Sequence, residues 1–143
     1  EIEIRPGVKT ESFITRIVSI QTEKDTLNEI IPGGLMGIKT DIDPFYSSKD
    51  KLAGTIIGLK GHLPEVYKKL KVNLNLTDKF DGYWDPEVDD NIDLQIGTLL
   101  IEGKVTNLEP FEVELKKEAC IEKDSLIIIS RRLKIVGYCH IIT

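Results

Sequence analysis

Hydrophobic and polar residues alternate along much of this chain, and the alternation predicts β-strands. In four segments an apolar residue stands at every second position, with mostly charged or amide side chains between: residues 1–5, 70–76, 92–96 and 111–116. A period of two places one side of a strand against a core and the other in water. We therefore expect four half-buried strands, with Glu3 on the solvent side of the first.

Further strands are predicted from other patterns. Leu126-Ile127-Ile128-Ile129 is a continuous apolar run, which is typical of a strand covered on both faces. Residues 51–59 predict another strand, and residues 133–142 predict the last one. In that last strand one side would carry Leu133, Ile135, Gly137, Cys139 and Ile141. No window has a sustained helical period, so the fold class is all-β.

Turn residues divide the strands at the spacing of a β-barrel or sandwich. We place a domain boundary near Gly61, which gives one domain over residues 1–61 and a second over residues 62–143. About six strands fall in the second domain, enough to close a small barrel. The first domain has fewer strands and opens directly in one. We expect it to be an incomplete barrel with unpaired edges, the C-terminal portion of something longer.

Composition narrows the functional classes. The net charge of −5 argues against binding nucleic acid by bulk electrostatics, so any RNA contact must be local. The longest apolar run is far shorter than the ~20 residues that span a bilayer, and the N-terminus lacks the features of a signal peptide. Two cysteines do not make a disulfide scaffold. We expect a cytoplasmic protein with no membrane contact.

A glycine-rich loop is the most informative segment. Gly33, Gly34 and Gly37 lie with Pro32 between two strand-like runs. Glycine accepts positive φ and has no side chain to hold another molecule away from the main chain. The segment is therefore either a tight strand connection or a place where a ligand approaches the backbone.

The other candidates carry no chemistry that we can assign. The acidic segment around Trp84 predicts a solvated, mobile loop rather than a calcium site, with Trp84 pinning it to the barrel or meeting a partner. Cys139 and its neighbour His140 diverge on a strand and cannot share a metal ion. No phosphate-binding loop or guanine-recognition pattern occurs. We predict no catalytic residue and no metal site.

Two adjacent arginines are the last candidate binding residues. Arg131 and Arg132 follow an apolar strand, where they form either a solvated turn or a contact to RNA or a neighbouring domain. Adjacent strand residues point to opposite faces, so we expect at most one of them to reach a given partner.

Four motifs, in one order, resemble the C-terminal part of the gamma subunit of eukaryotic and archaeal translation initiation factor two. Its pattern has "RPG", a "PGGLxGVGTxxDP" loop, a "GxxGxLP" junction and an "SRR…LIGxGxI" terminus. The chain offers Arg5-Pro6-Gly7, Pro32 to Pro44, Gly58 to Pro64, and Ser130-Arg131-Arg132 followed by residues 135–141. It departs from the family where Lys39 and Cys139 replace glycines, where a tryptophan is absent near the end, and where residues 78–91 look shortened.

The resemblance implies a fold and a function. The fold is similar to elongation factor Tu: a GTP-binding domain, absent here, followed by two β-barrels, the first incomplete in this chain. The chain would then be no enzyme and bind no cofactor, with GTP and magnesium on the missing domain. Implied partners are initiator methionyl-tRNA, the alpha and beta subunits and the small ribosomal subunit. Candidate tRNA contacts are Gly33, Gly34, Gly37, Lys39, Thr40, Arg131 and Arg132.

Two alternatives remain open on the sequence. The chain could be a fragment of a related translational GTPase, such as an elongation or selenocysteine-specific factor. It could also be a β-barrel interaction module unrelated to translation.

Overall fold

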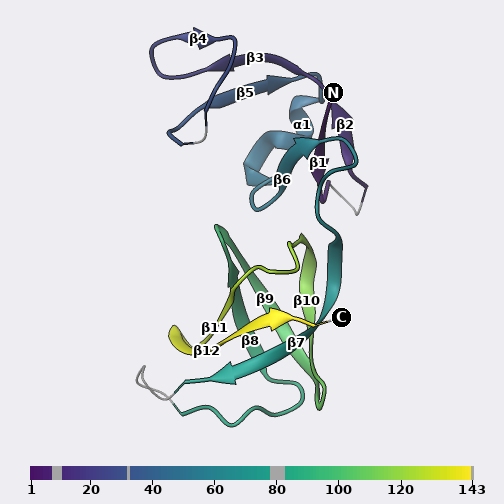
Figure 1. The fold of residues 1–143 in the computed structure, drawn as a ribbon, viewed down its shortest axis with the longest axis vertical. Coiled ribbons are helices and arrows are strands. Elements are labelled where there is room, and N and C mark those ends of the chain that lie inside the picture. The colour runs from purple at the N-terminus through teal and green to yellow at the C-terminus, as the bar shows by residue number, and fades with distance from the viewer. Residues whose placement is uncertain (8–10, 32, 78–82, 143) are drawn as a thin grey trace. The chain divides into compact units, whose positions relative to one another are not determined.

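A computed structural model describes residues 1–7, 11–31, 33–77 and 83–142 (Figure 1). The chain divides into two compact units. The first comprises residues 1–52 and 56–63, and the second comprises residues 53–55 and 64–143. Each has its own sheets.

The first unit contains two small antiparallel sheets. In one, β1 (Ile2–Arg5) lies between β2 (Phe13–Thr15) and β6 (Ile56–Leu59). In the other, β3 (Ile17–Gln21) lies between β4 (Thr26–Leu27) and β5 (Gly37–Thr40). One turn of helix, α1 (Pro44–Ser47), and a 3-10 turn, η2 (Ser48–Asp50), follow β5.

Two expectations for the first unit are wrong in detail. Glu3 is not on a solvated face but is buried, because main-chain and side-chain donors satisfy its carboxylate. The strand expected over residues 51–59 begins only at Ile56, since residues 51–54 form a turn. The Asp43-Pro44 turn signal starts α1: Asp43 caps it by accepting a hydrogen bond from the Phe45 amide at 2.8 Å.

The second unit is a closed barrel of six antiparallel strands, in the order β10-β7-β12-β11-β8-β9. The strands are β7 (Val66–Leu76), β8 (Asn91–Ile96), β9 (Leu99–Leu108), β10 (Phe111–Cys120), β11 (Ile127–Arg131) and β12 (Lys134–Ile141). The all-β fold class and the six-stranded barrel predicted from the sequence are confirmed.

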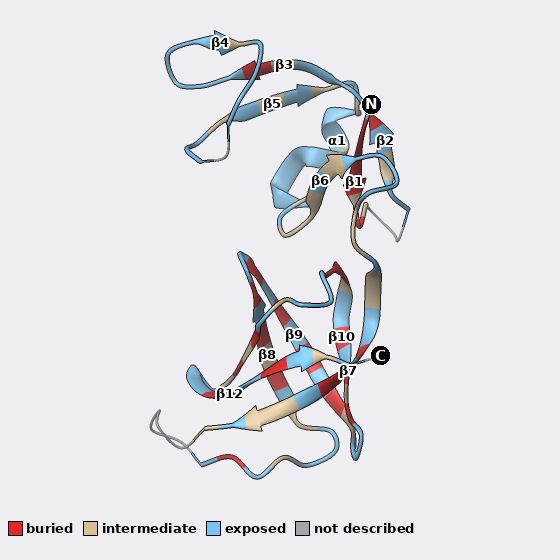
Figure 2. Ribbon diagram, viewed as in Figure 1, coloured by how far each residue is buried: buried red, intermediate tan, exposed pale blue. Residues whose placement is uncertain are grey.

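The inward residues of these strands form one hydrophobic core (Figure 2). Leu70, Leu94, Val113 and Ile127 have no exposed surface, which is the alternation that the sequence predicted. Trp84 covers part of this core from the segment between β7 and β8, and its ring meets Phe111 edge-on, with centroids 6.3 Å apart. The barrel is therefore filled by side chains.

The last two strands differ from the prediction. In β11 Ile127 and Ile129 are buried but Ile128 is only half-buried, so this strand is not covered on both faces. In β12 the register shifts by one residue between the pairs Ile129–Gly137 and Ser130–Ile135. A bulge of this kind changes which face a side chain occupies. Val136 is consequently buried, whereas Ile135 is exposed.

Within the described part of the chain, no helix is long and apolar enough to cross a membrane.

Candidate functional site

The glycine loop leads into β5, and its backbone is open. Gly33 and Gly34 have φ angles of +112° and +79°, in the left-handed region that favours glycine. Among the described residues, and apart from the two chain neighbours, no atom lies within 4 Å of the place where a Cβ would stand on either glycine. Pro32 lies outside the described residues. The glycines thus provide both the turn and an unobstructed stretch of main chain.

Apolar side chains flank this open stretch on both sides. Ile31 is 81% exposed and Leu35 is 83% exposed. Large aliphatic residues gain little from full contact with water, and their burial against another molecule is favourable. The tip of the loop therefore combines accessible main chain with accessible apolar surface.

The strand after the loop presents one cation. In β5 Gly37 and Lys39 are exposed, and Ile38 and Thr40 are half-buried. Lys39 pairs in register with Ser19 of β3. It forms no hydrogen bond or ion pair with any residue that the structure describes, so its ammonium group is available to an anion.

Contacts from Thr15 of β2 and from Arg16, which lies between β2 and β3, fix the chain where β5 ends. Arg16 donates a hydrogen bond to Asp41 at 2.6 Å, and the Asp41 amide donates to the hydroxyl of buried Thr15 at 3.2 Å. These contacts join positions 25 and 26 residues apart, and nothing in the sequence pattern pairs them. They hold the strand on which Lys39 lies.

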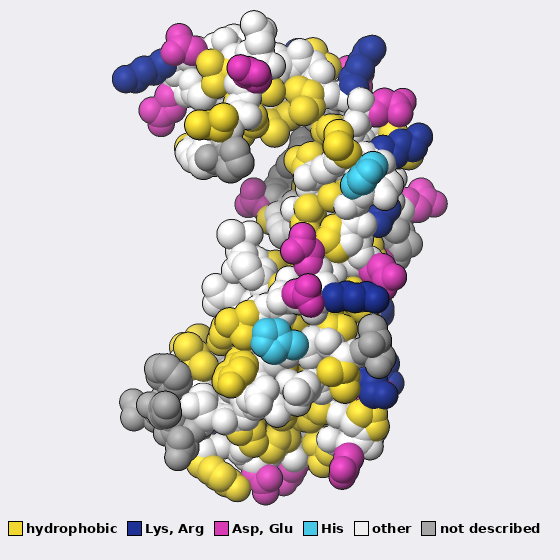
Figure 3. Space-filling model, in the orientation of Figure 1, with side chains coloured by type: hydrophobic (Ala, Val, Ile, Leu, Met, Phe, Trp, Pro, Cys, Tyr) yellow, Lys and Arg dark blue, Asp and Glu magenta, His cyan; other side chains and the backbone are white. Residues whose placement is uncertain are grey.

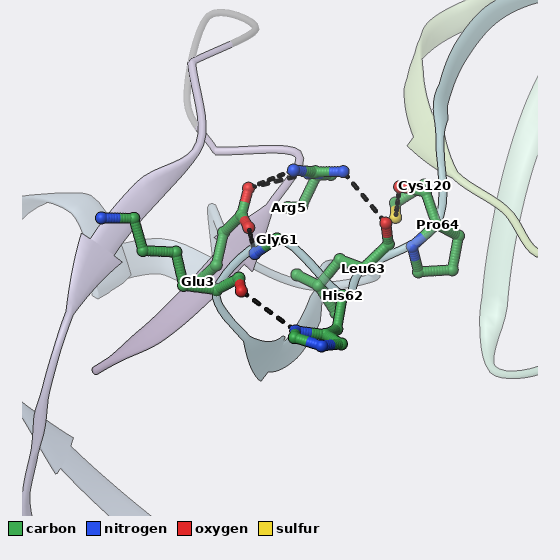
Figure 4. Close-up of polar contacts among 8 residues, drawn as sticks. Glu3, Arg5, Gly61, His62, Leu63, Pro64 and Cys120 are labelled. Atoms are coloured by element: carbon green, nitrogen blue, oxygen red, sulfur yellow. Dashed lines mark hydrogen bonds and ion pairs between the residues drawn. The ribbon is translucent and has the colours of Figure 1, made fainter.

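A buried carboxylate explains two of the family motifs (Figure 4). Glu3 accepts hydrogen bonds from the Gly61 amide at 2.9 Å and from Arg5 Nε at 2.9 Å, and it forms an ion pair with the same guanidinium. Arg5 also donates to the Leu63 carbonyl at 3.1 Å. The Gly61 hydrogen bond and the Arg5 contacts lower the pKa of Glu3. Arg5 and Gly61 thus have structural roles in the first unit.

The cysteines have no reactive setting. Cys120 is buried, and its thiol donates to the Pro64 carbonyl at 3.2 Å. Burial raises the pKa of the Cys139 thiol to about 12, so it stays protonated, while His140 next to it is exposed. Among the residues described, no group of three His, Cys, Asp or Glu side chains could hold a metal ion.

A second carboxylate anchors the acidic segment. Asp90 accepts hydrogen bonds from Trp84 Nε1 at 2.8 Å, from the Glu87 amide at 3.0 Å and from Arg131 at 2.6 Å. Burial raises the pKa of Asp90, but the donors from Trp84 and Glu87 and the charges of Arg131 and Arg132 outweigh this and lower it. The segment around Trp84 is thus pinned to the barrel and is not a freely solvated loop; its residues 78–82 lie outside the described part.

Both arginines line one pocket, contrary to the expectation that they face opposite ways. The pocket has a volume of about 380 Å³, and Asp89, Asp93 and Glu102 also line it. The strand ends at Arg131, and Arg132 has a φ of +51°, so the alternation of strand faces does not extend to it. Arg131 is neutralised by Asp90, and Arg132 forms no hydrogen bond or ion pair with the described residues.

Charge is dispersed over one face of the described residues. On the face shown in Figure 3, the described Lys and Arg side chains are scattered among Asp and Glu and form no continuous basic area. This agrees with the net charge of −5. On this face, the described cations would therefore meet an anionic partner singly and not as a basic patch.

The fold and the site define an all-β protein of the β-barrel class, with its candidate contacts on exposed loops and strand ends. A family model for "Initiation factor eIF2 gamma, C terminal" matches residues 67–141. The chain therefore belongs to the family of translation initiation factor 2 gamma subunits. This membership selects the initiation factor over the two alternatives that the sequence left open.

Relatives with the name translation initiation factor 2 subunit gamma occur in several archaea. The chain is 35% identical to that of Pyrococcus furiosus, over 96% of this chain and 38% of the relative. It is 35% identical to that of Archaeoglobus fulgidus, over 93% and 34%, and 32% identical to that of Methanocaldococcus jannaschii, over 96% and 38%. The chain thus spans little more than a third of the length of these relatives.

Proposed function

We propose that this chain is the part of an initiation factor 2 gamma subunit that presents a tRNA-contact loop and docks the other components of the factor. The observation that carries the proposal is the glycine loop. In a chain of this family, it combines an open backbone at Gly33 and Gly34 with a cation at Lys39 that has no described partner. The ligand is the initiator methionyl-tRNA.

The proposed contacts divide by chemistry. Gly33, Gly34 and Gly37 let the end of the tRNA approach the main chain, because no side chain intervenes. Lys39 contacts a phosphate, and the hydroxyl of Thr40, on the opposite face of β5, offers a hydrogen bond to a separate group of the tRNA. Arg132 is the second cation available for a phosphate. Arg131 is held in an ion pair with Asp90 and supports the neighbouring Arg132.

The remaining functions belong to parts of the factor outside this chain. GTP and magnesium would bind a domain that precedes these residues in the full-length subunit, and GTP hydrolysis would occur there. The alpha and beta subunits and the small ribosomal subunit are the proposed protein and ribosomal partners. This chain would be a non-catalytic scaffold for them.

The test is a charge reversal at Lys39 in the full-length subunit. Lys39→Glu should weaken binding of initiator methionyl-tRNA by about tenfold and reduce the salt dependence of the binding constant by about one unit of slope, because one phosphate contact is lost. Lys24→Glu is the matched control, since Lys24 is also exposed and lies between β3 and β4 of the same sheet. An unchanged affinity and salt slope for Lys39→Glu would refute the proposed contact.

A further inference from the structure

Two exposed rings lie on the outer face of β12. Tyr138 is 43% exposed and His140 is exposed, while Cys139 between them is buried. The side chains of Tyr138 and His140 form no hydrogen bond with any residue that the structure describes. Residues two apart on a strand share a face and lie about 6.5–7 Å apart. The two rings therefore form a short platform on the outside of the barrel.

An asparagine lies opposite each ring. The strands β7 and β12 are neighbours (Figure 1), and Tyr138 pairs in register with Asn75, as His140 does with Asn73. Directly opposed residues have Cβ atoms about 4.5–5.5 Å apart. Asn75 Nδ2 donates to the Asn73 carbonyl at 3.4 Å, and the Asn73 side chain forms no hydrogen bond with the described residues. Each ring thus has an amide beside it, and an amide offers both donors and an acceptor.

A cation lies at one end of this platform. Lys71 is on the same outer face of β7, and its ammonium group forms no ion pair with any described residue. It pairs in register with Glu112 of β10, whose carboxylate is held instead by Lys69 at 2.5 Å. On the opposite side, β11 places the uncharged Ile128 in register with Tyr138. Among these described neighbours, the unpaired charge is positive.

We propose that this outer face of β7 and β12 binds an unpaired strand of RNA. We call it the aromatic face and define it by Lys71, Asn73, Asn75, Tyr138 and His140. Two neighbouring bases stack on the rings, the asparagine amides contact the base edges, and Lys71 contacts a phosphate. Aromatic side chains on a sheet recognise single-stranded RNA in this way, because unpaired bases can be splayed out and stacked.

The spacing and the polarity of the aromatic face select this ligand. A duplex fits poorly, because its successive bases lie about 3.4 Å apart and are stacked on one another. An apolar protein segment also fits poorly, since amides and a lysine lie beside the rings where an interface core would have apolar groups. The net charge of −5 requires any RNA contact to be local, and this face is local. The inference does not rest on the tRNA contacts proposed above.

The test is fluorescence anisotropy of labelled RNA titrated with the 143-residue chain at about 50 mM salt. The probes are an oligouridine of about ten nucleotides and an RNA duplex of about ten base pairs. We expect saturable binding of the oligouridine, at least about fivefold tighter than binding of the duplex. Equal binding of both probes, or binding of neither, would overturn the proposal.

Substitutions of the rings test the stacking. Tyr138→Ala and His140→Ala should each weaken oligouridine binding at least about fivefold, because one base loses its stacking partner. Tyr138→Phe keeps the ring and should bind within about twofold of the wild type. Tyr83→Ala is the matched control, since Tyr83 is 88% exposed in the segment between β7 and β8 and should leave binding unchanged.

Substitution of the lysine tests the phosphate contact. Lys71→Gln should reduce the slope of the logarithm of the binding constant against the logarithm of the salt concentration by about 0.7, the value for one phosphate of a single strand. Lys123→Gln, at an exposed position after β10, is the control and should keep the slope of the wild type. The fluorescence of Trp84, which packs in the barrel core, shows that each variant is folded.

Initiator tRNA with and without its unpaired 3′ end identifies the source of the strand. A loss of affinity in Tyr138→Ala that is confined to the intact tRNA would support the proposal and assign the strand to the tRNA end. A loss for oligouridine but for neither tRNA would support it and assign the strand to another RNA. Unchanged oligouridine affinity in both alanine variants would overturn the proposal. A dimer of the chain that dissociates in Tyr138→Ala would overturn it as well, because the aromatic face would then cover a second copy.

Discussion

At the scale of single residues, two carboxylates accept hydrogen bonds from donors that the strand pairing does not satisfy. Glu3 binds the Gly61 amide and the Arg5 guanidinium in the first unit. Asp90 binds Trp84, the Glu87 amide and Arg131 in the second. A buried carboxylate with several donors is stabilising only while all the donors remain in place.

Removal of the Asp90 carboxylate should therefore destabilise the barrel. Asp90→Ala leaves the Trp84 indole and the Glu87 amide without their acceptor and Arg131 without its ion pair. We expect a loss of about 2–4 kcal/mol in the free energy of unfolding, measured by urea denaturation with Trp84 fluorescence. Asp124→Ala, at an exposed position, is the control and should change stability by less than about 0.5 kcal/mol.

The same carboxylate gives this loss a pH dependence. The pKa of Asp90 lies below its ordinary value of 3.8, so the folded state binds this proton less readily than the unfolded state. The stabilisation is complete above the ordinary pKa and disappears as the pH falls through the lower, folded value. The difference in stability between the wild type and Asp90→Asn should thus be constant near neutrality and shrink below about pH 4. A difference that grows on acidification would contradict the assignment.

At the scale of elements, the sequence predicts strands well and the faces of the last strand poorly. The alternation over residues 111–116 and over the first part of residues 70–76 agrees with burial, although Leu76 is exposed, and both segments are barrel strands. The bulge at Val136 cannot be recognised in the hydrophobic pattern. The sequence therefore assigned the residues of β12 that precede the bulge to the wrong face of the strand. The two-residue turn at Arg132 and Leu133 was not predicted either, because these residues are not the Asn and Gly that signal such a turn.

In the glycine loop, too, the sequence predicted local backbone features but not the contacts between distant segments. Its glycines mark the open backbone because their conformations are a local property. The contacts of Asp41 with Thr15 and Arg16 depend on the pairing of separate strands and could not be inferred from a single sequence. The tRNA contacts suggested for the loop remain a prediction.

Gly137 tests the packing of β12 against β7. A Cβ on Gly137 would lie 2.6 Å from the backbone carbonyl oxygen of Asn75, and a main chain in a closed barrel cannot easily move away. On Gly103 of β9 it would lie 2.6 Å from Val113 and 2.7 Å from Leu94, where side chains can shift. We expect Gly137→Ala to cost about 2–3 kcal/mol and Gly103→Ala about 1–2 kcal/mol in urea denaturation. The reverse order would contradict this account of the barrel.

At the scale of the whole molecule, the hydrophobic core is distributed unequally. Of the described hydrophobic residues that are buried, only Ile2, Ile4 and Ile20 belong to the first unit, and all the others belong to the second. Ile57 and Leu59 on β6 remain 47% and 66% exposed. A unit of ~60 residues is only marginally stable even with a full core. The first unit should therefore contribute little cooperative stability of its own.

This imbalance predicts two unfolding transitions in the 143-residue chain. Trp84 is the single tryptophan and packs in the barrel, so its fluorescence follows only the second unit, whereas far-ultraviolet circular dichroism follows the strands of both. The dichroism should begin to change at a lower urea concentration than the fluorescence, and the two curves should not coincide. In hydrogen exchange, the amides of β1–β6 should exchange at least about tenfold faster than those of β7–β12, because local opening of the first unit exposes less apolar surface. Coincident transitions with equal protection of both units would show that they unfold together, and the first unit would then require a source of stability other than its own core.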